Sequence, residues 1–288
     1  MRKWLIVSLG IIVVILLVSP WMLILFAKKE IHDPGIPVRA NLIEKEPKRR
    51  VLALFPHPDD EVTVAGTLMK LKEDGHEIHL VCLTKGEKGK SSGIEDEVYL
   101  AQLRAEEMKA SASLIGADEL TLHDYPDSGL STLGLDSLKG IASEIIQEIQ
   151  PDILVSYDSK VGLYGHPDHR LSGQAVEEVF MRNVDDPDFP AKKLFQVTLC
   201  KKQIKLALKL SEGFQRNYPE DRSQGLPYPD FSVVTRPYFK RVLKVMEVHQ
   251  TQQDVLKDLM PYHREIPAWI YSRIFDREYF YEVRRIED

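Results

Sequence analysis

Apolar residues follow two alternating spacings from residue 51 onward, and this alternation predicts strands separated by helices. Short apolar runs, typical of buried parallel strands, occupy residues 51–55, 78–84, 120–122 and 153–157. Elsewhere apolar residues recur at steps of three and four, which predicts amphipathic helices over residues 61–74, 95–117, 134–149 and 168–181. Strands that alternate with helices favour right-handed crossovers. We therefore expect a Rossmann-like three-layer α/β domain with a mostly parallel sheet.

The last hundred residues carry a weaker pattern. Residues 195–199 and 232–235 have the composition of strands, and the spacing over residues 236–259 predicts one long helix. The pattern assigns no role to the region 190–288. We place the folded domain at residues 51–288.

A run of 24 uncharged residues, Trp4 to Ala27, precedes this domain. As a helix it would be about 36 Å long, enough to cross a hydrocarbon core of about 30 Å. Two basic residues flank it on each side. The alternative, a cleaved signal peptide, would have a shorter apolar core and a small-x-small cleavage site. The run therefore predicts one transmembrane helix, a signal-anchor of residues 1–27.

The basic flanks nearly balance, so the positive-inside rule does not decide the orientation of this helix. Because a very short tail precedes the run, we expect the domain on the extracytoplasmic side, with the cytoplasmic face as the alternative. Residues 28–50 mix charges with three prolines and lack periodicity, so we interpret them as a tether. Together these features predict a single-pass membrane protein.

Charge and cysteine content exclude several classes of protein. The chain has 38 Lys and Arg against 44 Asp and Glu, a net charge of −6, whereas nucleic-acid binding usually needs a basic face. With 43% hydrophobic and 28% charged residues, the chain resembles neither disordered proteins nor proteins with many membrane spans. Two cysteines are too few for a disulfide scaffold or a Cys-rich zinc module. None of these features predicts an oligomeric state.

Two histidine-containing motifs follow the predicted strands directly. Residues 56–61 read Pro-His-Pro-Asp-Asp-Glu after the first strand, and residues 165–169 read Gly-His-Pro-Asp-His after the fourth. In open parallel sheets, ligands bind beyond the carboxyl ends of the strands, where the strand order reverses. If the four strands have the order 3-2-1-4, the first and fourth are neighbours and the two motifs face one crevice.

These motifs have the chemistry of a catalytic metal centre. His57 and Asp60 are three residues apart, as are His166 and His169, so each pair shares one face of a helical turn. Two histidines and one carboxylate leave a position open for water, so we expect His57, Asp60 and His169 to hold Zn²⁺, with Fe²⁺ as the alternative. Asp59 is then the candidate general base, and His166 the candidate general acid or oxyanion stabiliser. The pattern predicts metal-assisted amide hydrolysis.

A structural role would explain either motif taken alone. Acidic residues 59–61 suit a helix N-terminus, Asp168 suits a helix cap, and His166 and His169 could lie at the surface. Two motifs with the same spacing, each at a strand end, favour the metal site instead.

The two motifs resemble those of the LmbE-like or PIG-L-type N-acetylglucosaminyl deacetylases, whose hallmarks are A-H-P-D-D-E and H-P-D-H loops. The resemblance covers about residues 50–185. It implies a mononuclear zinc site of His57, Asp60 and His169, with Asp59 as base and His166 as its acid or electrostatic partner. Pro56 departs from the usual alanine, so the fine geometry of the first loop is open.

Other segments match softer motifs of the same family. Arg104 lies in an R-x-x-E segment, whose arginine contacts sugar hydroxyls in the family, and Asp127 lies in a D-[GS]-G turn. Tyr164 stands where related enzymes carry a mobile tyrosine, and residues 249–252 are similar to an H-x-S-Q element. The resemblance thus implies that Arg104, Asp127 and Tyr164 bind substrate. By their residue types alone, Arg104 would also suit a solvated helix face and Asp127 a plain turn.

We therefore expect hydrolysis of the N-acetyl group of a GlcNAc-containing glycoconjugate, with release of acetate and a free amine. A small molecule, a lipid-linked sugar and an envelope glycan all fit as substrates. One alternative is a non-haem Fe(II) oxygenase, because two histidines and a carboxylate also suit that metal. The other is a membrane-tethered sugar-binding module without catalysis.

Overall fold

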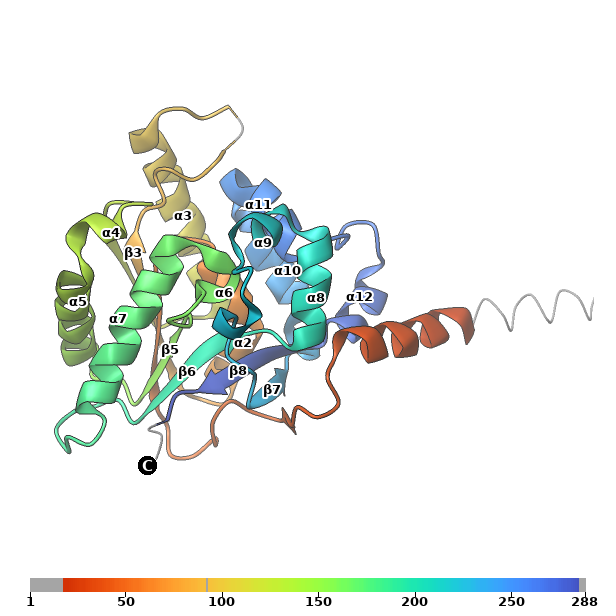
Figure 1. The fold of residues 1–288 in the computed structure, drawn as a ribbon, viewed down its shortest axis with the longest axis horizontal. Helices are drawn as coiled ribbons and strands as arrows, with labels where there is room; N and C mark the ends of the chain where they lie inside the picture. The colour runs from red at the N-terminus through yellow and green to blue at the C-terminus, as the bar shows by residue number, and fades with distance from the viewer. Residues whose placement is uncertain (1–17, 92, 285–288) are drawn as a thin grey trace, which may run out of the picture.

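The computed structural model describes residues 18–91 and 93–284. Within them, one sheet has the strand order β1-β7-β8-β6-β5-β2-β3-β4 (Figure 1). β8 is antiparallel to both β6 and β7, and the other neighbours are parallel. The strands are β1 (Val38–Arg39), β2 (Arg50–Phe55), β3 (Glu77–Thr84), β4 (Glu119–Tyr125), β5 (Ile153–Ser156), β6 (Lys193–Thr198), β7 (Phe231–Val234) and β8 (Arg277–Glu282).

Helices cover both faces of this sheet. Along β2, Val51, Ala53 and Phe55 join one buried cluster with α2, α3 and α10, whereas Leu52 and Leu54 join another with α5 and α7. The helical elements are η1 (Asp60–Val64), α2 (Ala65–Glu73), α3 (Glu97–Ile115), α4 (Leu130–Leu133), α5 (Leu135–Ile149), α6 (Gly162–Gly165), α7 (Pro167–Asn183), α8 (Lys201–Leu210), α9 (Glu212–Asn217), η2 (Arg222–Gln224), η3 (Arg236–Tyr238), α10 (Phe239–Val248), η4 (Gln250–Gln252), α11 (Gln253–Leu259) and α12 (Ala268–Ile274).

The predicted α/β class and the mostly parallel sheet are confirmed. The four strands predicted before residue 160 correspond to β2, β3, β4 and β5, and their spatial order is the expected 3-2-1-4. β2 and β5 are therefore neighbours, and Val51 pairs with Ile153. β1 and β8 were not predicted. β1 lies within the segment interpreted as a tether and pairs with β7.

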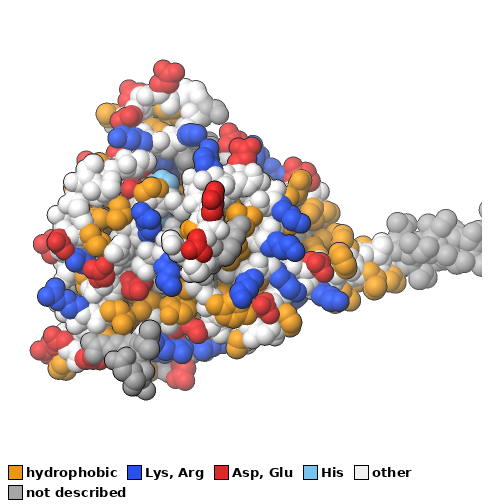
Figure 2. Space-filling model, viewed as in Figure 1, with side chains coloured by type: hydrophobic (Ala, Val, Ile, Leu, Met, Phe, Trp, Pro, Cys, Tyr) orange, Lys and Arg blue, Asp and Glu red, His pale blue; other side chains and the backbone are white. Residues whose placement is uncertain are grey.

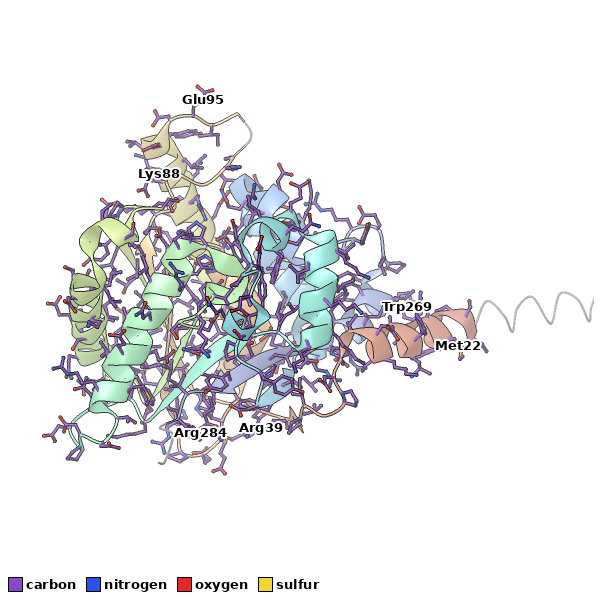
Figure 3. All side chains as sticks on the ribbon, in the orientation of Figure 1. Met22, Arg39, Lys88, Glu95, Trp269 and Arg284 are labelled. Atoms are coloured by element: carbon purple, nitrogen blue, oxygen red, sulfur yellow. The ribbon has the colours of Figure 1, made fainter. Side chains whose placement is uncertain are left out.

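The predicted single-pass membrane protein is contradicted. Among residues 18–91 and 93–284, none of the helices combines the length and the apolar character needed to cross a bilayer. The helix of residues 18–31 contains three charged residues at its end and packs through Ile24 and Ile31 against Ile274 of α12. Six other apolar side chains of this helix are exposed, those of Val18, Trp21, Met22, Leu23, Leu25 and Phe26 (Figures 2 and 3). The ring of Trp21 lies 6.2 Å from the ring of Trp269. The first part of the predicted anchor, residues 1–17, lies outside the described residues.

The prediction of one long helix over residues 236–259 is wrong. The structure has η3, α10, η4 and α11 in its place. α10 ends at His249, whose backbone leaves the helical region with φ −78° and ψ 63°. The imidazole of His249 is fully buried and its Nε2 lies 2.7 Å from Oε1 of Glu61. This tertiary contact, which the helical periodicity does not reveal, accompanies the break.

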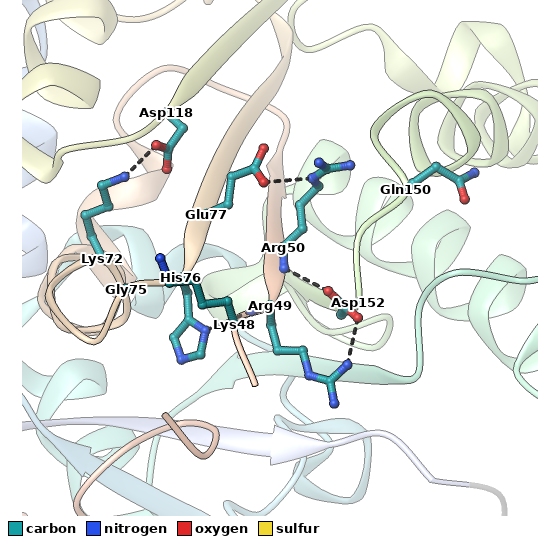
Figure 4. A pocket seen from close by; sticks show the side chains of 10 residues that line it. All are labelled: Lys48, Arg49, Arg50, Lys72, Gly75, His76, Glu77, Asp118, Gln150 and Asp152. Atoms are coloured by element: carbon teal, nitrogen blue, oxygen red, sulfur yellow. Dashed lines mark hydrogen bonds and ion pairs between the residues drawn. The ribbon is translucent and has the colours of Figure 1, made fainter. Parts of the chain in front are cut away.

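A cavity of about 600 Å³ lies at the amino ends of β2 and β3 (Figure 4). The two motifs lie at the opposite, carboxyl ends of the strands. Its charged side chains largely neutralise one another. Arg49 lies 3.0 Å from Asp152, and Arg50 lies 3.2 Å from Glu77. The cavity therefore contributes nothing to the chemistry predicted from the motifs.

Candidate functional site

The first motif forms a tight loop between β2 and η1. The carbonyl of Pro56 accepts both the backbone N–H and the hydroxyl of Thr84, each at 2.9 Å, which ties the loop to the end of β3. Asp59 has φ 107°, in the left-handed region that non-glycine residues rarely adopt. Asp60 starts η1, and its Oδ2 accepts the backbone N–H of His57 at 2.8 Å. Pro56 therefore fits the loop through its carbonyl, without needing an N–H.

The second motif begins α7. His166 is the N-cap and Pro167 the first helical residue, a position where the missing N–H of proline is harmless. Nδ1 of His166 accepts the backbone N–H of Asp168 at 3.2 Å. Nδ1 of His169 lies 3.2 Å from the carbonyl of Gly162, where any side chain would collide with His169. If that ring donates from Nδ1, its Nε2 is free to bind a metal.

The three predicted ligands converge as the sequence led us to expect. Nε2 of His169 lies 3.1 Å from Nδ1 of His57 and 3.1 Å from Oδ1 of Asp60. Nδ1 of His57 lies 3.5 Å from Oδ2 of Asp60. Ligands about 2.0–2.1 Å from a tetrahedral Zn²⁺ are separated by about 3.3 Å. The three side chains are buried, and their spacing fits one metal ion.

Further polar groups contact the outer atoms of these ligands. Nε2 of His57 lies 3.1 Å from Oδ1 of Asp127 and 3.5 Å from Oδ2 of Asp168. The hydroxyl of Tyr157 donates to Oδ1 of Asp60 at 2.9 Å. Carboxylates that face the outer nitrogen of a histidine fix its tautomer and orient it toward the metal.

Other groupings of these side chains also bring metal-binding atoms together. One consists of His57, His166 and His169, and the other of His57, Asp127 and Asp168, with the atoms of each group within 4.8 Å of one another. His57 belongs to both because its two nitrogens face opposite sides. The predicted ligands Asp60 and His169 both lie on the side of Nδ1.

Charged neighbours outweigh burial in setting the pKa values of His57 and Asp60. Burial would lower the pKa of His57, but the carboxylates of Asp127, Asp168 and Asp60 outweigh it and raise that pKa well above its usual value. Burial would likewise raise the pKa of Asp60, but His169 and His57 hold it well below its usual value.

The candidate acid and base stand beside the ligands. Asp59 is largely buried, and burial raises the pKa of its carboxyl to about 6 despite the nearby Arg104. His166 is half-buried, with its ring 4.9 Å from that of His57, and burial together with the neighbouring histidines lowers its pKa to about 4. The ring of Tyr164 lies 4.9 Å from the ring of His169.

Arg104 and Asp127 contact the protein itself. Arg104 is 3% exposed, donates to the carbonyls of Gly86 and Pro58, and lies 3.3 Å from Oδ1 of Asp59. Asp127 is also buried, and its Oδ2 accepts the backbone N–H of Lys88 at 2.8 Å. Lys88 lies on the loop that projects beyond the body of the molecule (Figure 3). Substrate binding by Arg104, Asp127 and Tyr164 thus stays a prediction.

Sequence reasoning missed several polar residues of the site. Asp168 stands inside the second motif and Tyr157 ends the fourth predicted strand, so their positions carried a usable signal. Ser111 carried none, because it lies 50 residues from Glu61, to which it binds. His249 lies 188 residues from Glu61, and the resemblance of residues 249–252 to an H-x-S-Q element assigned it no partner.

Comparison with known proteins supports the family resemblance. Residues 52–180 match the PIG-L family model, described as GlcNAc-PI de-N-acetylase. The chain is 33% identical over 135 residues to a probable N-acetyl-alpha-D-glucosaminyl L-malate deacetylase 2 of Bacillus anthracis, an alignment covering 46% of this chain and 59% of the relative.

Solved structures share the fold. N,N'-diacetylchitobiose deacetylase from Pyrococcus horikoshii aligns with a TM-score of 0.59 and 24% identity, over 83% of this chain and 85% of that one. The 4-carboxy-2-hydroxymuconate hydratase GalB from Pseudomonas putida KT2440 also aligns with a TM-score of 0.59, with 17% identity over 83% of this chain and 98% of that one. Because the two carry different activities, these structures show the fold alone. Residues 52–180, which contain both histidine motifs, thus match the PIG-L family.

Proposed function

We propose that this chain is a metal-dependent deacetylase that removes the N-acetyl group of a small GlcNAc-containing molecule. One observation carries the proposal: His57, Asp60 and His169 meet at distances of 3.1–3.5 Å, with Asp59 and His166 beside them. The family description and the acetylated sugar named for the Bacillus anthracis relative support the same substrate class.

His57, Asp60 and His169 would hold Zn²⁺ or Fe²⁺, which when bound polarises a carbonyl oxygen and acidifies water. Asp59 takes one proton from the attacking water as the new carbon–oxygen bond forms. Because Nδ1 of His166 accepts a backbone N–H, the neutral ring carries its proton on Nε2. That N–H donates to the developing oxyanion. The carbon–nitrogen bond then breaks as Asp59 returns this proton to the amine nitrogen, which leaves a free amine and acetic acid that ionises to acetate.

The surroundings of Asp59 suit a general base. Its carboxylate is largely buried and lies 3.3 Å from the guanidinium of Arg104. This contact orients the carboxylate, and at this distance the ion pair is not a short one. We infer that Arg104 holds this carboxylate, and that Tyr164, whose ring lies beside His169, is the better placed of the two to meet substrate.

The proposal is tested by mass spectrometry of acetylated aminosugars after incubation with the metal-loaded full chain. We expect a mass loss of one acetyl group from at least one GlcNAc derivative, and no loss with Asp59→Asn at equal metal content. Intact substrates throughout the panel would refute the proposed function, and full activity of Asp59→Asn would refute its general-base role.

A further inference from the structure

A buried carboxylate behind the first motif uses both of its oxygens. Glu61 is fully buried, and its Oε2 accepts the backbone N–H of Asp59 at 3.0 Å. Its Oε1 accepts from Nε2 of His249 at 2.7 Å and from the hydroxyl of Ser111. His249 is fully buried as well. The turn that carries Asp59 is therefore fastened to residues far away in the chain.

Charge accompanies this contact. Burial opposes ionisation of both groups, but their mutual attraction lowers the pKa of Glu61 and raises that of His249. A buried ion pair adds little net stability, because desolvation offsets the attraction. The pair therefore acts mainly on the conformation of the loop. Asp59 has a strained, left-handed backbone, which a contact of this kind can maintain.

One face of α3 makes the remaining contacts that hold this loop. Arg104, Glu107 and Ser111 are spaced by three and four residues, so they lie along one side of the helix. Arg104 faces the carboxylate of Asp59, and Ser111 binds Glu61. Between them, Glu107 accepts the N–H of Thr251 at 2.8 Å and its hydroxyl at 2.7 Å. The segment after α10 is thus held against the same helix that holds the loop.

We propose that Glu61 and His249 are positioning residues, which hold Asp59 in its left-handed conformation so that its carboxylate reaches the attacking water. This inference rests on the proposed function, because it takes Asp59 as the general base. It also assigns a role to the segment beyond α10, which lies outside the family match.

The test compares three variants of the full chain. His249→Ala removes the donor to Glu61, whereas His249→Gln offers an amide N–H in its place. Val245→Ala is the matched control, because Val245 is a fully buried core residue of the same helix, α10. It lowers stability through the core and leaves the side chains of Glu61 and His249 unchanged.

We expect His249→Ala to lower kcat about 100-fold, the scale of a misplaced catalytic group. KM and the affinity for Zn²⁺, measured by competition with a chelator, should stay within about 3-fold, and His249→Gln should recover part of the loss. Val245→Ala should keep its kcat. An unchanged kcat in His249→Ala, or a loss explained by lost zinc, would overturn the inference.

A second readout does not depend on catalysis. Hydrogen exchange of the Asp59 amide in the metal-free protein should accelerate at least about 10-fold in His249→Ala and not in Val245→Ala, because opening of this one hydrogen bond exposes the amide. If wild-type protein deacetylates nothing, the proposed function fails, and the exchange result alone then decides whether Glu61 and His249 hold the turn. Equal exchange in the two variants would overturn the inference.

Discussion

The hydroxyl of Tyr157 offers a clean perturbation of the predicted metal site. It donates to Oδ1 of Asp60 at 2.9 Å, while its ring stacks on that of His169 with centroids 4.3 Å apart and planes 8° apart. The ring also meets Phe55 edge-on at 5.0 Å. Tyr157→Phe removes the hydrogen bond and keeps both ring contacts, so the substitution tests the orientation of Asp60 alone.

The magnitude follows from the kind of hydrogen bond that is lost. A hydrogen bond to a charged acceptor contributes about 1.5–3 kcal/mol. Loss of a group that orients a metal ligand typically weakens metal binding about 10–100-fold, or about 1.4–2.8 kcal/mol, which is the same range. We therefore expect Tyr157→Phe to bind Zn²⁺ about 10–100-fold more weakly, with kcat close to that of wild type once zinc is saturating.

The assay is competition between the protein and a fluorescent chelator for Zn²⁺. Tyr238→Phe is the matched control, because the Tyr238 hydroxyl also donates to a carboxylate at 2.9 Å, that of Glu73, on α2 rather than at the metal site. Its zinc affinity should equal that of wild type. If Tyr157→Phe and Tyr238→Phe bind zinc equally well, Asp60 is not a ligand oriented by Tyr157 and the reasoning is wrong.

Three further predictions address stability and catalysis. Burial outweighs the N–H groups of Gly66 and Thr67 and raises the pKa of Glu278 from 4.5 to about 7. The folded state therefore keeps a proton that the unfolded state loses, and the free energy of unfolding falls by up to about 3 kcal/mol as the pH rises from 4.5 to 7. Urea unfolding at pH 5 and pH 8 should show a smaller fall in Glu278→Gln than in wild type, and an equal fall would contradict this prediction. Zinc at 100 times its Kd should stabilise the fold by about 2.7 kcal/mol, measured from denaturant curves with and without chelator, and His169→Ala should abolish this gain; a gain retained by the variant would exclude His169 as a ligand. Asp59→Asn should lower kcat about 10²–10⁴-fold in steady-state assays at full zinc content, and a loss below about 10-fold would remove it as general base.

The sequence specified the half of the fold that carries the motifs. β2, β3 and β5 are buried on both faces, so their apolar runs were legible, and the order of these strands brought His57 and His169 together as expected. The residue types and spacing of the two motifs were enough to predict this meeting, because both motifs follow strands that are neighbours in the sheet.

The remaining features depend on contacts between distant segments. β8 lies between β6 and β7, but it contains charged Arg277 and Glu278, which hide its strand pattern. Glu278 stands there because it accepts two N–H groups at the start of α2. The helix ends before His249, whose side chain contacts Glu61 instead of continuing the helical pattern. Arg104 is buried because it contacts Asp59 in the first loop, a contact that the pattern of its own helix does not reveal.

The packing of the apolar N-terminal run also depends on a contact with a distant segment. Hydropathy alone predicted a membrane anchor, but Ile24 and Ile31 pack against α12. Apolar character predicts burial without naming the partner, and for these two residues the partner is the domain itself.

The most direct test of the account is a zinc titration of acetate release. The metal-stripped full chain is assayed with an acetylated GlcNAc substrate at increasing equivalents of Zn²⁺. We predict no acetate without metal and a rise that saturates at one equivalent per chain, together with an equimolar free amine. Acetate release by the stripped protein, or none at any zinc level across the substrate panel, would contradict the account.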